Sequence, residues 1–296
     1  MSYNYAGQPP YQGGGYQPNL NNPYQQAPTG PGWNVPPGEN QGAYMPPPPM
    51  APRMMNEAYV ESGAGPKDNL SFSDQTIRAA FIRKVFTMVA IMLGIVAIMT
   101  AIPFIHRPVQ AYIHRNTALY WVSYGTFFVV YLALMCCESV RRSFPSNLVM
   151  TGLLTLSIGY MTMMISSMYN IESVLLTLII TTICCGSIII FASTTKRDLT
   201  SMMGVMFILS MVLMIFGLVA MLSIFIFHVR WLYTVYSGLA ALVFMFYLAI
   251  DIQMIMGGRK YEISPEDHIF AAIQVFLDII YIFWMLLSLL GGSSNN

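Results

Sequence analysis

Seven long apolar runs dominate the sequence after residue 80 and constrain the fold more than any other feature. Each run holds about 18 to 26 residues, which is enough for a helix to cross the hydrocarbon core of a bilayer. The runs cover residues 85–105, 118–137, 148–168, 174–191, 202–227, 231–256 and 269–290. The sequence therefore predicts an all-α integral membrane protein, a seven-transmembrane-helix bundle with short loops.

The composition indicates the same class of protein. Hydrophobic residues make up 55% of the chain and charged residues only 9%. Soluble domains, in contrast, carry roughly a quarter of charged residues. The expected surroundings are a lipid bilayer, and no nucleic-acid partner is expected at a net charge of +1.

Residues 1–77 differ from the rest and are rich in proline, glycine, tyrosine and glutamine. Such a segment buries too little apolar area to offset its chain entropy, so we expect a disordered cytosolic tail before a transmembrane domain at residues 78–292. The proline run at residues 46–49 fits a polyproline ligand for a domain with an aromatic-lined groove. A solvated tail without a specific partner is the alternative.

Basic residues flank the predicted helices unequally and set the expected orientation. The side of the tail carries nine of them, namely Arg78, Arg83, Lys84, Arg141, Arg142, Lys196, Arg197, Arg259 and Lys260. The opposite side carries Arg107, Arg115 and Arg230. We therefore expect the amino terminus in the cytosol and the carboxyl terminus in the lumen.

The seventh predicted helix has a readable start in the stretch I-S-P-E-D-H. Ser264 suits the N-cap position, Pro265 the first helical position and Asp267 the third. The pattern predicts that Ser264 caps this helix.

Two aspartates, Asp251 and Asp278, lie well inside the sixth and seventh runs, with no charged residue within five positions on either side. A carboxylate at membrane depth costs a few kcal/mol and is usually kept for a task. At 1.5 Å per residue, the two lie about 7–8 Å and about 13–14 Å from the cytosolic ends of their helices. Helix tilt can absorb that difference, so the two side chains can meet.

If the two carboxyl groups meet, low dielectric and like charge prevent both from ionising easily, and they share a proton as a unit. Such a pair is a proton-sensitive latch. In its deprotonated form it offers the oxygen ligands that Ca²⁺ prefers, so Asp251 and Asp278 are the predicted gating residues and transient calcium ligands. In the alternative reading, each aspartate has a structural role and satisfies a neighbouring hydroxyl or backbone group.

Four further residues are candidates to support the aspartates. Arg141 and Arg142 are counter-ion candidates, because a buried carboxylate normally finds an opposite charge, although both equally suit a role in topology. Gln253 and Gln274 are the supporting polar candidates. Gln274 precedes Asp278 by four residues and shares its helix face.

Four stretches of the chain resemble the Bax-inhibitor-motif, or lifeguard, family of seven-helix membrane proteins. They are F-I-R-K-V-F at 81–86, R-R-S-F-P-S-N at 141–147, L-A-I-D-I-Q-M-I-M-G-G at 248–258 and S-P-E-D-H-I-F-A-A-I-Q-V-F-L-D-I-I at 264–280. The last two stretches are specific, whereas seven spans alone are not.

The resemblance implies a helix bundle in the endoplasmic reticulum, Golgi or a related membrane that acts as a pH-sensitive calcium leak and protects against apoptosis. It implies that Asp251 and Asp278 gate the pore and that Arg141 or Arg142 is linked to them. Apoptosis-regulating membrane proteins are the implied partners and calcium is the permeant ion. No cofactor and no enzymatic activity are expected.

Two positions depart from the family pattern. The family commonly has threonine directly after the first aspartate and asparagine three residues after the second. This chain has Ile252 and Tyr281 there, which removes or reshapes polar support near the aspartates.

Two other functions are compatible with parts of the sequence. An intramembrane aspartyl protease also places one aspartate on each of two adjacent spans, but its G-x-G-D motif is absent, since the second aspartate here stands in V-F-L-D. The serious alternative is a non-conducting membrane protein that binds apoptosis regulators. Nothing in the residues excludes it.

Overall fold

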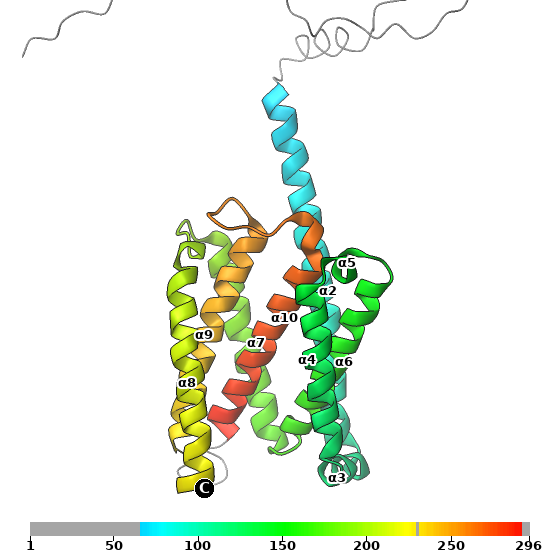
Figure 1. The fold of residues 1–296 in the computed structure, drawn as a ribbon, viewed down its shortest axis with the longest axis vertical. Helices are drawn as coiled ribbons and strands as arrows, with labels where there is room; N and C mark the ends of the chain where they lie inside the picture. The colour runs from blue at the N-terminus through cyan, green and yellow to red at the C-terminus, as the bar shows by residue number, and fades with distance from the viewer. Residues whose placement is uncertain (1–65, 229–230, 292–296) are drawn as a thin grey trace, which may run out of the picture. The chain divides into compact units, whose positions relative to one another are not determined.

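The computed structural model describes residues 66–228 and 231–291. Most of the predicted disordered tail, residues 1–65, lies outside the described residues. Every element within the described ranges is helical (Figure 1). The elements are α2 Pro66–Ile105, α3 Arg107–Arg115, α4 Ala118–Cys136, α5 Glu138–Arg142, α6 Ser146–Ser166, α7 Ile171–Thr194, η1 Thr200–Met202, α8 Met203–Phe227, α9 Trp231–Met256, η2 Pro265–Asp267 and α10 His268–Gly291.

Seven of the described helices are long and apolar enough to cross a membrane, which confirms the predicted architecture. They are α2, α4, α6, α7, α8, α9 and α10. The first of them begins earlier than the apolar pattern indicated. Because α2 starts at Pro66, residues 66–77, which the sequence assigned to the tail, belong to a helix.

Two short helices, α3 and α5, were not predicted because each lies in a connection between spans. Pro108 stands near the start of α3, where a missing backbone N–H costs no helical hydrogen bond. α5 consists of the five residues from Glu138 to Arg142 and follows α4 directly after Cys137. Its two arginines bind Asp267 of η2, the short turn directly before α10.

Helix α10 is the central element of the described bundle and packs against α9, α7, α2 and α6 (Figure 1). In the apolar 18-residue stretch of this span, 67% is buried inside the protein, against 11% for the span that contains α8. α8 packs mainly on α9 and directs most of its side chains outward. The core therefore forms around the seventh span, while α8 presents a lipid-facing surface.

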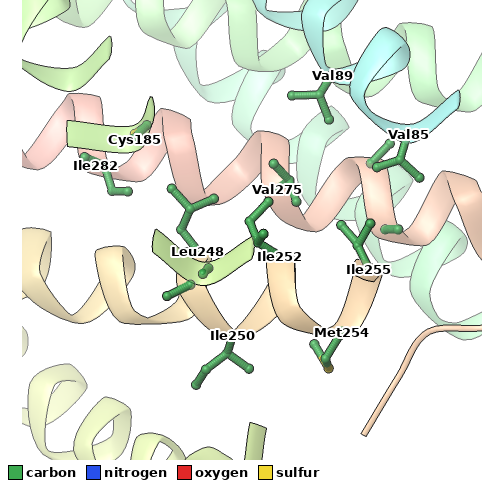
Figure 2. Packing of buried hydrophobic residues seen from close by; sticks show 14 of the residues in the cluster. Val85, Val89, Cys185, Leu248, Ile250, Ile252, Met254, Ile255, Val275 and Ile282 are labelled. Atoms are coloured by element: carbon green, nitrogen blue, oxygen red, sulfur yellow. The ribbon is translucent and has the colours of Figure 1, made fainter. Parts of the chain in front are cut away.

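An apolar cluster fixes how α9 and α10 lie on one another. Figure 2 shows Leu248, Ile252 and Ile255 of α9 directed toward α10, where Val275 and Ile282 face them. All five side chains are buried. Burying aliphatic side chains at helical spacing along one face locks the register of two helices.

The turn after α9 needs two glycines with left-handed backbone. Gly257 has φ of 76° and Gly258 has φ of 70°, a region that L side chains rarely adopt. A Cβ at Gly257 would also meet the guanidinium group of Arg78, which binds the carbonyl oxygen of Ile263 at 2.7 Å and Glu262 at 2.7 Å. The turn is thereby tied to α2.

The start of the seventh span differs in part from the prediction. Pro265 is the first residue of the 3₁₀ turn η2, as expected, and Ser264 precedes it in an extended conformation. The Ser264 side chain, however, makes no capping hydrogen bond. Instead the backbone N–H of Asp267 donates to the Ser264 carbonyl oxygen at 2.9 Å, and the Asp267 carboxylate is taken by arginines.

Candidate functional site: a buried carboxyl pair

Asp251 of α9 and Asp278 of α10 meet inside the bundle. Their relative exposures are 4% and 8%, so both are buried. The two side chains lie within interaction range of one another. A hydrogen bond between two carboxyl groups requires a proton on one of them, because an ionised carboxylate only accepts hydrogen bonds. We call these two residues the carboxyl pair.

Helical spacing explains why the two aspartates face one another. Asp251 follows Leu248 by three residues, and Asp278 follows Val275 by three, so each aspartate shares the face that its helix buries against the other. Replacing one aliphatic side chain on each face by a carboxyl group places two polar groups in an otherwise apolar contact.

Gln274 is the supporting residue that the structure brings to the carboxyl pair. Its side-chain amide donates to Asp251 Oδ2 at 3.4 Å, a long contact, across the α9–α10 interface. Its own oxygen, Oε1, and Asp278 Oδ2 are buried and lack a hydrogen-bond partner among the described residues. Two unsatisfied oxygens therefore lie in the same polar site.

The oxygen atoms at the carboxyl pair form only part of a cation site. Within residues 66–228 and 231–291, no three His, Cys, Asp or Glu side chains are grouped to hold a metal ion. Two carboxyl groups and one amide oxygen supply only part of the six to eight oxygens that Ca²⁺ takes. The remaining ligands would be water molecules.

Gln253 is not part of this site, contrary to the prediction. Its Oε1 accepts a hydrogen bond from the Leu199 backbone N–H at 2.8 Å. Its amide donates to the carbonyl oxygens of Arg197 at 2.9 Å and Ala192 at 3.4 Å. The residue ties α9 to the connection between α7 and α8 and points away from the carboxyl pair.

Arg141 and Arg142 likewise do not pair with the predicted carboxylates of Asp251 and Asp278. Both bind Asp267: Arg141 Nη2 lies 3.2 Å from Oδ1, and Arg142 Nε lies 3.1 Å from the same atom. In the part of the chain that the structure describes, neither arginine forms an ion pair with Asp251 or Asp278. The assignment of a counter-ion to the carboxyl pair is corrected accordingly.

The two arginines differ in their surroundings. The Arg141 side chain is 14% exposed, donates to the carbonyl oxygens of Leu134 and Met135, and lies over the Phe270 ring. Arg142 is 39% exposed and also binds Glu138 and Glu266. The hydrogen bond to Asp267, followed by these acidic charges, raises the pKa of the Arg142 guanidinium. The ion pairs of the two arginines with Asp267 and Glu266 therefore connect α5 to the start of the seventh span.

The two departures from the family pattern are packed into apolar surroundings. Ile252 has no exposed surface and belongs to the cluster between α9 and α10. The Tyr281 ring stacks on Phe244 with 4.9 Å between centroids and meets Trp284 edge-on. At both positions the chain has replaced expected polar support by apolar packing.

Two neighbours of the carboxyl pair were not predicted. Tyr131 on α4 lies within electrostatic range of both aspartates, and Cys185 on α7 lies within range of Asp278. Each is one polar residue in a long apolar run, and no spacing rule singles it out. Only the fold brings them to the site, since α7 packs on α10 and α4 packs on α6, which also contacts α10.

The fold and the site together define a seven-helix integral membrane protein with a carboxyl pair in its core. Residues 78–295 match the family described as Inhibitor of apoptosis-promoting Bax1. The chain belongs to this family, the Bax-inhibitor or lifeguard proteins, which confirms the resemblance seen in its motifs. It is a membrane protein of a family that inhibits apoptosis.

Similarity to two members of the family extends over nearly the whole chain, and similarity to a third covers about three quarters of it. It is 39% identical to Protein lifeguard 3 of Homo sapiens, over 97% of this chain and 94% of that protein. It is 38% identical to Protein lifeguard 3 of Mus musculus over the same shares. Protein lifeguard 4 of Mus musculus is 27% identical over 72% of this chain and 85% of its own length.

Proposed function

We propose that the protein is a pH-sensitive calcium leak channel of an intracellular membrane, gated by the carboxyl pair of Asp251 and Asp278. Through this leak it lowers stored calcium and so opposes apoptosis. The observation that carries the proposal is that two buried carboxyl groups on adjacent spans lie within interaction range of one another. No enzymatic step is part of the proposed activity.

The contact makes the site sensitive to protons. A hydrogen bond between two carboxyl groups requires one proton. In a low dielectric, ionising the second carboxyl group or leaving either group without a hydrogen-bond partner costs free energy. A gain or loss of one proton therefore changes how α9 and α10 hold together. The pair titrates as one unit rather than as two independent acids.

Ion passage requires the pair to open. Both carboxyl groups are buried in this arrangement, so a cation reaches them only when the two helices part. Once separated and deprotonated, the carboxylates and Gln274 Oε1 supply oxygen ligands for Ca²⁺. Such incomplete ligation suits conduction, because an ion must leave as readily as it enters.

Calcium efflux from liposomes tests the proposal. Wild type, Asp251→Asn and Asp278→Asn are compared in mildly acidic and mildly alkaline buffer. We expect each asparagine variant to lose the pH dependence of flux, because an amide neither shares nor releases the proton. Glu172→Gln, at an exposed carboxylate in the first turn of α7, is the matched control and should retain the wild-type response.

The same experiment separates the rival functions. Unchanged flux and unchanged pH response in both asparagine variants would remove the gating proposal and leave a non-conducting protein that binds apoptosis-regulating membrane proteins. Cleaved peptide released by purified wild type but not by either variant would indicate an aspartyl protease instead. The location proposed for the leak is the endoplasmic reticulum or Golgi.

The proposed orientation places the start of α2, α5 and η2 in the cytosol and the last residues of α10 in the lumen. It rests on the excess of basic residues at the ends of the spans on the tail side. The tail is then available to cytosolic domains that bind proline-rich ligands. Protease accessibility of epitopes at the two ends, in sealed vesicles, tests this orientation.

A further inference from the structure

Two adjacent cysteines stand where the second span ends. Cys136 is the last residue of α4 and of the span, and Cys137 follows it in an extended conformation. The charged helix α5 begins directly afterwards at Glu138. The chain therefore changes from a lipid-spanning helix to a polar segment at these two residues, which places their sulfur atoms at the border between membrane and water.

Both thiol groups are free, and both residues are exposed. The second cysteine pair of the chain differs, because Cys184 is half-buried and Cys185 is buried within α7. Cys184 precedes Thr194, the last residue of α7, by ten residues, or about 15 Å of helix. That depth is the middle of a hydrocarbon core about 30 Å thick. Of the two pairs, the one after α4 is within reach of an enzyme at the membrane surface.

A lipid-facing strip of α4 leads to Cys136. Val129 and Leu132 precede it by seven and four residues, the spacing that places side chains on one face of a helix. Both side chains are exposed on the outer surface of the bundle. At 1.5 Å per residue, Val129 lies about 10 Å deeper along the helix than Cys136. A hydrocarbon chain attached to the Cys136 sulfur therefore has an apolar helix face to lie on.

The connection after α5 presents further apolar surface. Phe144, between α5 and α6, is 81% exposed, and Leu148 and Val149 in the first turn of α6 are exposed as well. Neighbouring exposed apolar side chains are typical of a surface that contacts a membrane. The edge of the protein that carries α5 therefore lies against lipid rather than in open water.

From this arrangement we infer that Cys136 and Cys137 form an S-acylation site, which takes a long-chain fatty acyl group from acyl-coenzyme A. Cysteines beside a membrane span are the usual position for this modification. A cysteine thiolate attacks the carbonyl carbon of the donor thioester. The cysteine sulfur gains the acyl group, the bond from that carbon to the coenzyme sulfur breaks, and coenzyme A leaves as a thiol with the cysteine proton.

The acyl chain would hold α5 at the membrane. This helix has five residues and none of them is buried. Its arginines bind Asp267 on one side, as described above. A hydrocarbon chain inserted into lipid next to Glu138 adds a second attachment, and insertion strengthens with each methylene group that it buries.

Exchange of acyl groups for polyethylene glycol tests the inference on the full chain in cultured mammalian cells. Free thiols are blocked with N-ethylmaleimide, thioesters are cleaved with neutral hydroxylamine, and the released thiols are coupled to a maleimide that carries polyethylene glycol. We expect wild type to show a gel shift that requires hydroxylamine. The double variant Cys136→Ser/Cys137→Ser should lose this shift. The matched control Cys184→Ser/Cys185→Ser should retain it.

Peptide mapping of the wild type gives an answer that does not depend on the folding of any variant. Cells are fed an alkynyl fatty acid, and the purified chain is digested with trypsin. Both cysteines after α4 fall in the fragment 116–141, whereas Cys184 and Cys185 fall in the fragment 143–196. We expect the hydroxylamine-sensitive label on the first fragment and not on the second.

Three results would overturn the inference: no hydroxylamine-dependent shift in wild type, a shift of wild-type size in the double variant at the end of α4, or label on the fragment 143–196 alone. The inference rests on the proposed orientation, in which this end of α4 faces the cytosol and its acyl donors. A membrane-impermeant maleimide, added after hydroxylamine to cells with only the plasma membrane permeabilised, tests that orientation separately. Acylation found in detergent extracts but not reached by this reagent would keep the site and refute the orientation. Calcium flux is not a readout, so the result is independent of the proposed leak.

Discussion

Gln253 accepts a hydrogen bond from the backbone N–H of Leu199 at 2.8 Å, and this contact joins α9 to the turn before α8. The residue stands only two positions after Asp251 yet serves another part of the structure. The glutamine beside the carboxyl pair is Gln274. We therefore expect substitutions of the two glutamines to differ in their effect on stability.

Gln253→Leu is expected to destabilise the protein by about 1–3 kcal/mol, because it leaves the partly buried Leu199 N–H and the Arg197 carbonyl without their partner. Thermal unfolding in detergent measures the loss. Gln274→Leu is the matched control: it removes one long hydrogen bond and one unsatisfied oxygen, so the midpoint should change little. Equal loss in both variants would contradict this assignment.

Arg141→Gln is expected to lower the free energy of unfolding by about 1–3 kcal/mol, because Asp267 then loses a partly buried partner. Arg142→Gln should cost less, since its ion pairs are exposed and screened by salt. Denaturant titration at low and high salt measures both variants. A larger loss of unfolding free energy for Arg142→Gln than for Arg141→Gln would show that the exposure of the side chain does not determine which arginine stabilises the protein more.

Acid should weaken the connection between α7 and α8. Asp198 accepts hydrogen bonds from the Thr200 hydroxyl at 2.6 Å and from the backbone N–H groups of Thr200 and Lys260. The Thr200 hydroxyl, first among these donors, lowers the pKa of the Asp198 carboxyl below its ordinary value of 3.8. A lowered folded pKa contributes stability above the unfolded pKa and loses it as the pH falls through the folded value.

Asp198→Asn is therefore expected to be less stable than wild type at neutral pH and to lose less on acidification below about pH 4. Thr200→Val should shift the response in the same direction by a smaller amount, because the backbone donors remain. Unfolding midpoints across the acid range provide the measurement. An unchanged acid response in Asp198→Asn would assign the pH dependence to other groups.

Replacing Ile252 by threonine, the residue that is common in the family directly after the first aspartate, should destabilise this chain. Ile252→Thr places a hydroxyl among aliphatic side chains and is expected to destabilise by about 1–3 kcal/mol. Ile98→Thr, on the lipid-facing side of α2, is the control, since its hydroxyl can bond back along the helix without disturbing a core. If Ile252→Thr were neutral, the cluster would tolerate the polar support that the family pattern prefers.

The spans could be predicted because hydropathy acts over whole helices. The run at residues 231–256 coincides with α9, whereas the first helix begins far earlier than its apolar run. The first turns of α2 are polar, so they lie outside the apolar run from which the membrane-crossing part of the helix was predicted. α3 and α5 were missed for a similar reason, since each is too short to establish a period.

The meeting of Asp251 and Asp278 could be predicted from depth, because rise per residue converts sequence position into height within the membrane. The position of Gln253 could have been predicted too: two residues turn a helix by about 200°, which puts Gln253 on the face opposite Asp251. The partner of Arg141 could not. Its choice of Asp267 depends on where η2 passes α5, and sequence spacing carries no information about that approach.

The central place of α10 has a consequence for biogenesis. Of the described helices, it leaves the ribosome last, yet α2, α6, α7 and α9 all pack on it. The earlier spans thus enter the membrane before their shared neighbour exists, and native assembly waits for the end of translation. Premature termination before His268 would leave inserted helices that quality-control machinery can recognise as orphans.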